Sequence, residues 1–199
     1  MRVNDARQFG AKRWTSSPRS PTIIARSLRG SRYFSLRQPR KARGSISVPR
    51  AWKVFRVLDP KTVAYLDVGG SGNETNAHLG ADGRITIMFC AFDQPALIFR
   101  IYGKGRAVLP QDDGWAELYA RFTPLPGTRQ IFVIDVDEVQ TSCGWGVPFM
   151  TLDRERQTLS TYHAAQTGTE RLAKWAGRTT SIDGLPVRVA TVLPDCAGE

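Results

Sequence analysis

TVAYLDVGGSGNET, residues 62–75, predicts a buried strand, a glycine-rich turn and the first turn of a helix. The apolar, β-branched run at 62–68 has the length of a strand. Asn73 stands where a helix N-cap is expected, and Glu74 follows in the first turn, where a carboxylate is favourable. A turn of this kind can present backbone N–H groups to a phosphate, although it has neither the P-loop pattern nor the dinucleotide spacing. A tight turn without a ligand is the commoner meaning of such a string.

The rest of the chain after residue 55 predicts further long strands and a few short helices. Expected strands lie at 84–91, at 97–109 and from 130–136 on toward Cys143. Expected helices run from Glu74 to Gly80 or Gly83, over 112–122, and in two pieces within 154–178 that break at Thr167-Gly168. Gly103 and Gly105 lie inside the second of these strands and predict a bulge or a close approach of two backbones. Long strands with few helices predict a mainly β fold, an antiparallel barrel decorated by helices.

The basic character of the chain is confined to its first quarter. Residues 1–54 carry 14 of the 28 Lys and Arg residues and a single acid, a net charge of +13, whereas residues 55–199 carry −3. The basic segment shows no periodicity, which predicts a disordered tail. Its richness in Arg and Ser also fits a transit peptide, but three prolines disfavour the amphipathic helix that such a peptide needs. The slightly acidic remainder disfavours a nucleic-acid surface on the fold itself.

Composition excludes several other classes of protein and site. The 199 residues suit one domain, and no apolar run is long enough to cross a membrane. Cys90, Cys143 and Cys196 are too few and too scattered for a disulfide framework, so we expect a reducing, cytoplasmic compartment. His78 and His163 lie far apart in sequence, with no Cys or carboxylate recognised at ligand spacing, so no metal site is expected. Cys143 has no nearby histidine to activate it and is expected to be structural.

Arg100 lies within an otherwise apolar strand, between Phe99 and Ile101. Side chains alternate between the two faces of a strand, so Arg100 is expected to point outward while its neighbours point into the core. Pairing with a buried anion is the alternative.

Several strings, in order along the chain, resemble the pyridoxamine 5'-phosphate oxidase-like flavoproteins. The resemblance covers residues 55–186. The strings that resemble the family in general are Phe55–Pro60, Gly69–Thr75, Ala77–Leu79 and Gly83–Phe92. Those that resemble one bacterial branch of unknown substrate are Arg100–Arg106, Thr141–Pro148 and Ser181–Pro186.

This resemblance implies a split β-barrel that forms a homodimer, with flavin mononucleotide (FMN) bound between the subunits. It implies cofactor contacts for Ser71, Asn73 and Thr75 at the turn, and for Arg100 on its strand. Many relatives carry Ser-Arg-Lys where this chain has Ser71-Gly72-Asn73, so part of the positive charge facing the phosphate must come from elsewhere. The implied activity is that of an FMN-dependent oxidoreductase of unknown substrate. The alternative is a non-enzymatic protein that binds a cofactor, or that binds nucleic acid through its basic arm.

The resemblance begins only at residue 55, and a change of reading frame upstream of it would explain why. Family members begin with a strand similar to F-F-V-A-T-A-P and then V-N-x-S-P-K-G. Residues 33–40, translated one frame over, permit the first motif, and residues 44–53 permit V-N-I-S-P-K-G-L-E. A single-base change near Lys53–Val54 would restore the family spacing. We therefore expect residues 1–54 to be an out-of-frame or disordered segment, 55–187 to form a split barrel without its first strand, and 188–199 to be a tail. A frameshifted product without function is a further alternative.

Overall fold

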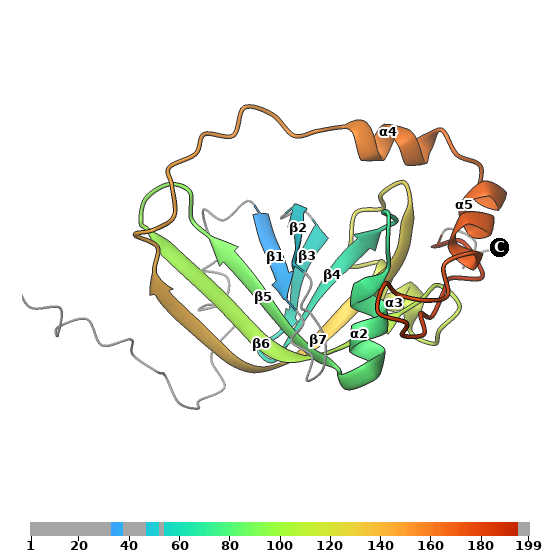
Figure 1. Cartoon of the computed structure of the whole chain (residues 1–199), viewed down its shortest axis with the longest axis horizontal. Coiled ribbons are helices and arrows are strands. Elements are labelled where there is room, and N and C mark those ends of the chain that lie inside the picture. Colours follow the sequence, from blue (N-terminus) through green and yellow to red (C-terminus); the bar gives the residue numbers. More distant parts are fainter. Residues whose placement is uncertain (1–32, 38–46, 52–53, 195–199) are drawn as a thin grey trace, which may run out of the picture.

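Seven strands form one antiparallel sheet in the computed structural model, which describes residues 33–37, 47–51 and 54–194 (Figure 1). Their order across the sheet is β2-β1-β5-β6-β7-β4-β3. The strands are β1 Tyr33–Arg37, β2 Ser47–Ala51, β3 Phe55–Asp59, β4 Thr62–Val68, β5 Arg84–Cys90, β6 Leu97–Val108 and β7 Thr128–Cys143. The helices are α2 Glu74–Asp82, α3 Trp115–Tyr119, α4 Thr158–Ala164 and α5 Gly168–Ala176. The mainly β fold expected from the sequence is confirmed.

Most elements lie where the sequence patterns place them. The strand expected at 62–68 is β4, and α2 ends at Gly83, whose φ of 73° suits a glycine in the left-handed region. Thr167 caps α5 by accepting a hydrogen bond from the Glu170 N–H, which explains the break between the last two helices. The helix expected over 112–122 is only the five-residue α3, because Gly114, with a φ of 78°, precedes its first turn. None of the described helices is both long and apolar enough to cross a bilayer.

The sheet curls until its last strand packs against the interior face of its third. The ring of Phe55 on β3 meets Phe89 on β5 edge to face, with centroids 5.3 Å apart, although β6, β7 and β4 separate the two strands in the sheet. β2 and β3 end the sheet and do not pair with each other within the described part of the chain. The curl encloses a core of fully buried side chains that includes Tyr65, Phe89, Phe99, Phe132, Leu66, Ile87 and Ile101.

Residues 33–37 form the strand β1, although the sequence predicts a barrel without its first strand, and the sheet nevertheless stays open between β2 and β3 in the described part of the chain. β1 pairs along one side with β5 and along the other with β2. Ladder hydrogen bonds join main-chain groups, so a strand can form here although the composition of the segment disfavours it. The edge of β5 is therefore covered. The out-of-frame origin of residues 33–53 stays a prediction, which the nucleotide sequence at codons 53 and 54 tests.

Gly103 marks a bulge where β6 and β7 approach closely, as its position in the strand predicts. The register of β6 against β7 shifts between Tyr102 and Gly103. A Cβ atom at residue 103 would collide with the backbone oxygen of Asp135. Since backbone atoms cannot rotate away as a side chain can, only glycine fits this position.

Replacing Gly103 by alanine should destabilise the fold, whereas alanine at Gly80 should stabilise it. The collision at Gly103 should lower the free energy of unfolding by about 1–3 kcal/mol, the usual cost of overpacking. A Cβ at Gly80, inside α2, meets nothing within 4 Å, so Gly80→Ala should raise the free energy by about 0.5–1 kcal/mol through helix propensity. Urea denaturation of both variants measures the two changes. Equal stability of the two variants would contradict the close approach.

Candidate functional site

A buried carboxylate organises the end of β4. Asp67 is fully buried and accepts two hydrogen bonds at Oδ2, from Arg129 Nε at 2.7 Å and from Gln130 Nε2 at 2.8 Å. Arg129 and Gln130 lie near the start of β7, which pairs directly with β4. A charge without water needs an opposite charge and further donors. This contact therefore fixes side chains of two neighbouring strands where β4 ends and β7 begins.

Gln130 extends this network to the start of α2. Its Nε2 donates also to Asn73 Oδ1 at 2.6 Å, and its Oε1 accepts from Asn76 Nδ2 at 2.7 Å. The backbone N–H of Arg188 in turn donates to Asn76 Oδ1 at 2.9 Å. Asn73 occupies the N-cap position, as expected, but its side chain makes no capping hydrogen bond to the helix. Side chains from β7, and not a local cap, thus hold the beginning of α2.

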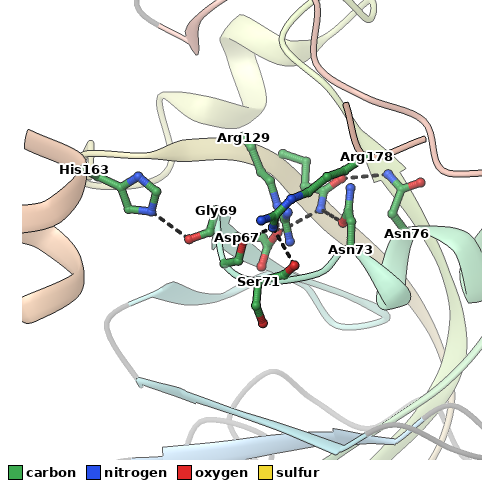
Figure 2. A network of polar contacts seen from close by, with 10 residues as sticks. Asp67, Gly69, Ser71, Asn73, Asn76, Arg129, His163 and Arg178 are labelled. Atoms are coloured by element: carbon green, nitrogen blue, oxygen red, sulfur yellow. Dashed lines mark hydrogen bonds and ion pairs between the residues drawn. The ribbon is translucent and has the colours of Figure 1, made fainter. Parts of the chain in front are cut away.

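The C-terminal part of the chain covers the glycine-rich turn (Figure 2). Arg178 donates through one guanidinium nitrogen to the carbonyls of Gly70 and Ser71, at 2.6 and 2.5 Å. His163 of α4 donates through Nε2 to the carbonyl of Gly69 at 2.7 Å. The ring of His163 lies so close to Gly127, where φ is 81°, that any Cβ there would collide with it. Two elements from the end of the chain therefore dock on the turn.

The structure gathers three of the four predicted cofactor residues and separates the fourth. Asn73 and Thr75 lie at the start of α2, with Thr75 buried. Ser71 is exposed, and its side chain points away from the network (Figure 2). Arg100 pairs with Gln140 on β7, ten residues beyond Gln130, which is a strand length of about 33 Å. Within one chain, Arg100 therefore belongs to a different place from the turn.

A narrow crevice beside the network has a positive lining. Its volume of about 10 Å³ corresponds to roughly one water molecule. Two guanidinium groups, Arg129 and Arg178, line it, against the single carboxylate of Asp67 in the adjoining network. An excess of one positive charge and several N–H donors suits an anion such as a phosphate group. The residues that line the crevice are Asn73, Arg129, Gln130, Trp175, Arg178, Val189 and Ala190.

No local sequence pattern predicts that Arg129, Arg178 or residues 189–190 lie at this place. Arg129 and Arg178 lie 62 and 111 residues beyond Asp67, so no local pattern joins them. Val189 and Ala190, in the segment expected to be a tail, line the crevice. An acid inside the apolar run of β4 was the one local signal, because a buried carboxylate requires a partner.

Arg100 lies on the face of β6 opposite the core, as strand alternation predicts. Phe99 and Ile101 are buried in the core, whereas Arg100 is half-buried and donates to Ser142 Oγ at 3.0 Å. Cys90 on β5 lies close enough to respond to this charge. Burial raises the pKa of the Cys90 thiol, and the Arg100 guanidinium partly offsets the rise. Cys143, at the end of β7, is exposed.

An apolar cavity of about 210 Å³ opens at this second place, between the loops that follow β5 and β7. Trp145 and Phe149 in its wall are 72% and 74% exposed. Large aromatic side chains at such exposure are unusual on a monomer surface and indicate a binding face. The lining residues are Ala91, Phe92, Asp93, Gln94, Ala96, Gly144, Trp145, Val147, Pro148 and Phe149.

His78 has carboxylates at ligand distance, contrary to the expectation from the sequence. Glu74 precedes it by one helical turn on α2, and Asp183 reaches it from the C-terminal segment. Their ligand atoms all lie within 4.8 Å of one another. The i, i+4 spacing of Glu74 and His78 was visible in the sequence, but Asp183, 105 residues away, was not.

A relative whose family is known is similar in sequence to about two thirds of this chain. Over 134 residues, 66% of the chain, it is 38% identical to the pyridoxamine 5'-phosphate oxidase family protein ustO of Aspergillus flavus. The resemblance to this family that the sequence motifs predict is thereby confirmed. The match spans about half (53%) of the length of the relative. That relative is fungal, so the match gives no support to a bacterial branch in particular. No family model matches the chain.

The solved structures that match the chain share little sequence with it. One is a pyridoxamine 5'-phosphate oxidase-related, FMN-binding protein from Nostoc punctiforme, with a TM-score of 0.46 and 15% identity over 64% of this chain and 85% of that one. Another is a FAD-binding protein from Mesorhizobium loti, with a TM-score of 0.40 and 16% identity over 61% and 93% of the two chains.

Removing the Asp67 carboxylate should destabilise the protein severely. Asp67→Ala leaves the Arg129 guanidinium buried without its counter-charge, which should cost about 3–5 kcal/mol. Asp82→Ala removes the partner of Arg84 in an exposed pair and should cost no more than about 1 kcal/mol. Urea denaturation of both variants makes the comparison, and a small loss for Asp67→Ala would contradict the dependence of the buried Arg129 on the Asp67 carboxylate.

Alkylation should distinguish Cys90 from Cys143. The thiolate is the reactive form, so the raised pKa of Cys90 should make it react more slowly than Cys143 at pH 8 and accelerate only at higher pH. Arg100→Gln removes the charge that lowers this pKa and should shift the profile of Cys90 further up in pH. Peptide mapping after timed iodoacetamide labelling measures both rates. A faster Cys90 in the Arg100→Gln variant would contradict the electrostatic contact.

Proposed function

We propose that this chain, a relative of the pyridoxamine 5'-phosphate oxidase family, is a flavoprotein that binds FMN and serves as an oxidoreductase. The observation that carries the proposal is the crevice between Arg129, Arg178 and the start of α2. It combines charge, N–H donors and a glycine-rich turn at the position where the family resemblance implies contacts with the cofactor.

Arg129 and Arg178 would supply the positive charge that faces the phosphate. The turn carries Ser71-Gly72-Asn73 where many relatives carry Ser-Arg-Lys, so the turn itself supplies no positive side chain. Arg178, partly exposed above the turn, and Arg129, buried beneath it, supply two. Because the crevice is narrow, Arg178 would exchange its bonds to the Gly70 and Ser71 carbonyls for bonds to the phosphate oxygens. An ionised acceptor makes that exchange favourable.

The apolar cavity would take the ring system of the flavin, from a second copy of the chain. Gln130 at the crevice and Gly144 at the cavity lie 14 residues apart on or next to β7, a strand length of about 46 Å. FMN is far shorter than that contour. Two copies that contributed one place each would let a single FMN contact both, in a homodimer with the exposed Trp145 and Phe149 at its interface.

The flavin would provide the redox chemistry, as flavins do in any such protein. The residues of the chain would bind and orient it. Arg129 and Arg178 would hold the phosphate, the Asp67 network would keep Arg129 and Asn73 in place, and Trp145 would exclude water from the ring.

FMN binding should depend on Arg178 and on Trp145. Arg178→Gln removes a charged hydrogen bond to the phosphate and should weaken binding about 10-fold or more. Arg106→Gln, an exposed arginine on β6, is the matched control and should leave affinity unchanged. Trp145→Ser should weaken binding and shift the elution volume from dimer toward monomer. Quenching of flavin fluorescence and gel filtration measure the two effects.

Two outcomes would count against the proposal in different ways. A wild-type chain that does not quench FMN fluorescence would contradict flavin binding altogether. Binding that is unchanged in Arg178→Gln would leave flavin binding intact but remove the crevice from the site.

A further inference from the structure

Glu74, His78 and Asp183 form a cluster outside the crevice. Glu74 and His78 are one turn apart on α2, so their side chains share a face of the helix. His78 Nε2 lies 3.2 Å from Asp183 Oδ2, and both side chains are largely excluded from solvent, at 5% and 13% exposed. The helix and the turn at 181–186 are thus brought together by groups that are all metal-ligand types.

The spacing of the cluster fits one ion. Imidazole nitrogens and carboxylate oxygens bind Zn²⁺ at about 2.0–2.2 Å, so two ligands on one ion lie about 3–3.5 Å apart. The 3.2 Å between His78 and Asp183 falls in this range, and the ligand atoms of all three residues lie within 4.8 Å of one another.

The carboxylates are held in place by neighbouring donors. Ser181 Oγ donates to Asp183 Oδ1 at 2.7 Å, and the backbone N–H of Ile182 donates to Glu74 Oε2 at 3.0 Å. The turn is closed by Gly184, with a φ of 80°, whose N–H donates to the Ser181 carbonyl at 3.0 Å. Ligands of structural metal sites are oriented by outer hydrogen bonds of this kind.

The donor types of the cluster suit a cation. One imidazole nitrogen and two carboxylate groups are ligands that Zn²⁺ accepts in proteins, and no cationic ligand type stands among the three.

We propose that Glu74, His78 and Asp183 bind a divalent transition-metal ion, with Zn²⁺ the best match to one nitrogen and two oxygen ligands. The ion would clamp the N-terminal half of α2 to the C-terminal turn at 181–186. Three protein ligands leave at least one coordination position for water. This site is independent of the flavin, since none of the three residues lines the crevice or the apolar cavity.

Metal titration of the full chain tests the clamp. After treatment with a chelator and dialysis, the wild-type chain should take up one equivalent of Zn²⁺, measured by elemental mass spectrometry. Co²⁺ in its place should give visible absorption bands, which report direct coordination. Glu74→Gln and Asp183→Asn, both close in shape to the native side chains, should each weaken binding about 10-fold or more. Glu117→Gln, an exposed carboxylate on α3, should bind as wild type does.

A second measurement separates lost binding from lost stability. For each chain, the melting temperature with Zn²⁺ is compared with that in chelator. The difference should be positive for wild type and for Glu117→Gln, because a ligand of the native state stabilises it, and near zero for Glu74→Gln and Asp183→Asn. No uptake of Zn²⁺ by the wild-type chain, or equal uptake and equal stabilisation in all four chains, would overturn the proposal. Neither result would bear on FMN binding.

Discussion

The buried carboxylate of Asp67 is the constraint on which the candidate site depends. An ionised group without water must be matched by donors from its surroundings, and here they are Arg129 and Gln130 of the neighbouring strand. The Gln130 amide nitrogen also donates to Asn73 Oδ1, and the Gln130 amide oxygen accepts from Asn76 Nδ2. The end of β4, the start of β7 and the beginning of α2 are thus positioned by one chain of obligatory hydrogen bonds.

Two glycines in this region, Gly69 and Gly127, are needed for the space that they leave. The ring of His163 can reach the carbonyl of Gly69 because Gly127, beside it, has no side chain. Trp175 Nε1 would lie 3.0 Å from a Cβ on Gly69 itself. The glycines therefore create the space into which α4 and α5 dock. Gly69 and Gly127 are required by this cover, whereas a Cβ at Gly70 would meet nothing within 4 Å.

Local patterns predicted the elements of the fold, and failed where partners are distant in sequence. The run at 62–68 predicts β4, Gly83 predicts the end of α2, and Gly103 predicts the bulge in β6. These features can be predicted because they depend on a few adjacent residues. β1 was missed since Arg, Pro and Gly dominate its neighbourhood, although Phe34 and Leu36 alternate with polar residues. The placement of Arg178 over Gly70 depends on contacts across more than a hundred residues. No rule based on the local spacing of residues predicts a contact between residues so far apart in sequence.

The glycine-rich turn and Arg178, which covers it, lie far apart along the chain, so the turn is synthesised well before its cover. Gly70 and Ser71 leave the ribosome long before Arg178, which donates to their carbonyls from 108 and 107 positions later. Domains of this size fold cooperatively once their distant contacts can form. A nascent chain that has made the whole sheet still lacks the residues that cover the glycine-rich turn. The cover of the turn is therefore completed only after Arg178 has been synthesised, when all seven strands of the described sheet have already left the ribosome.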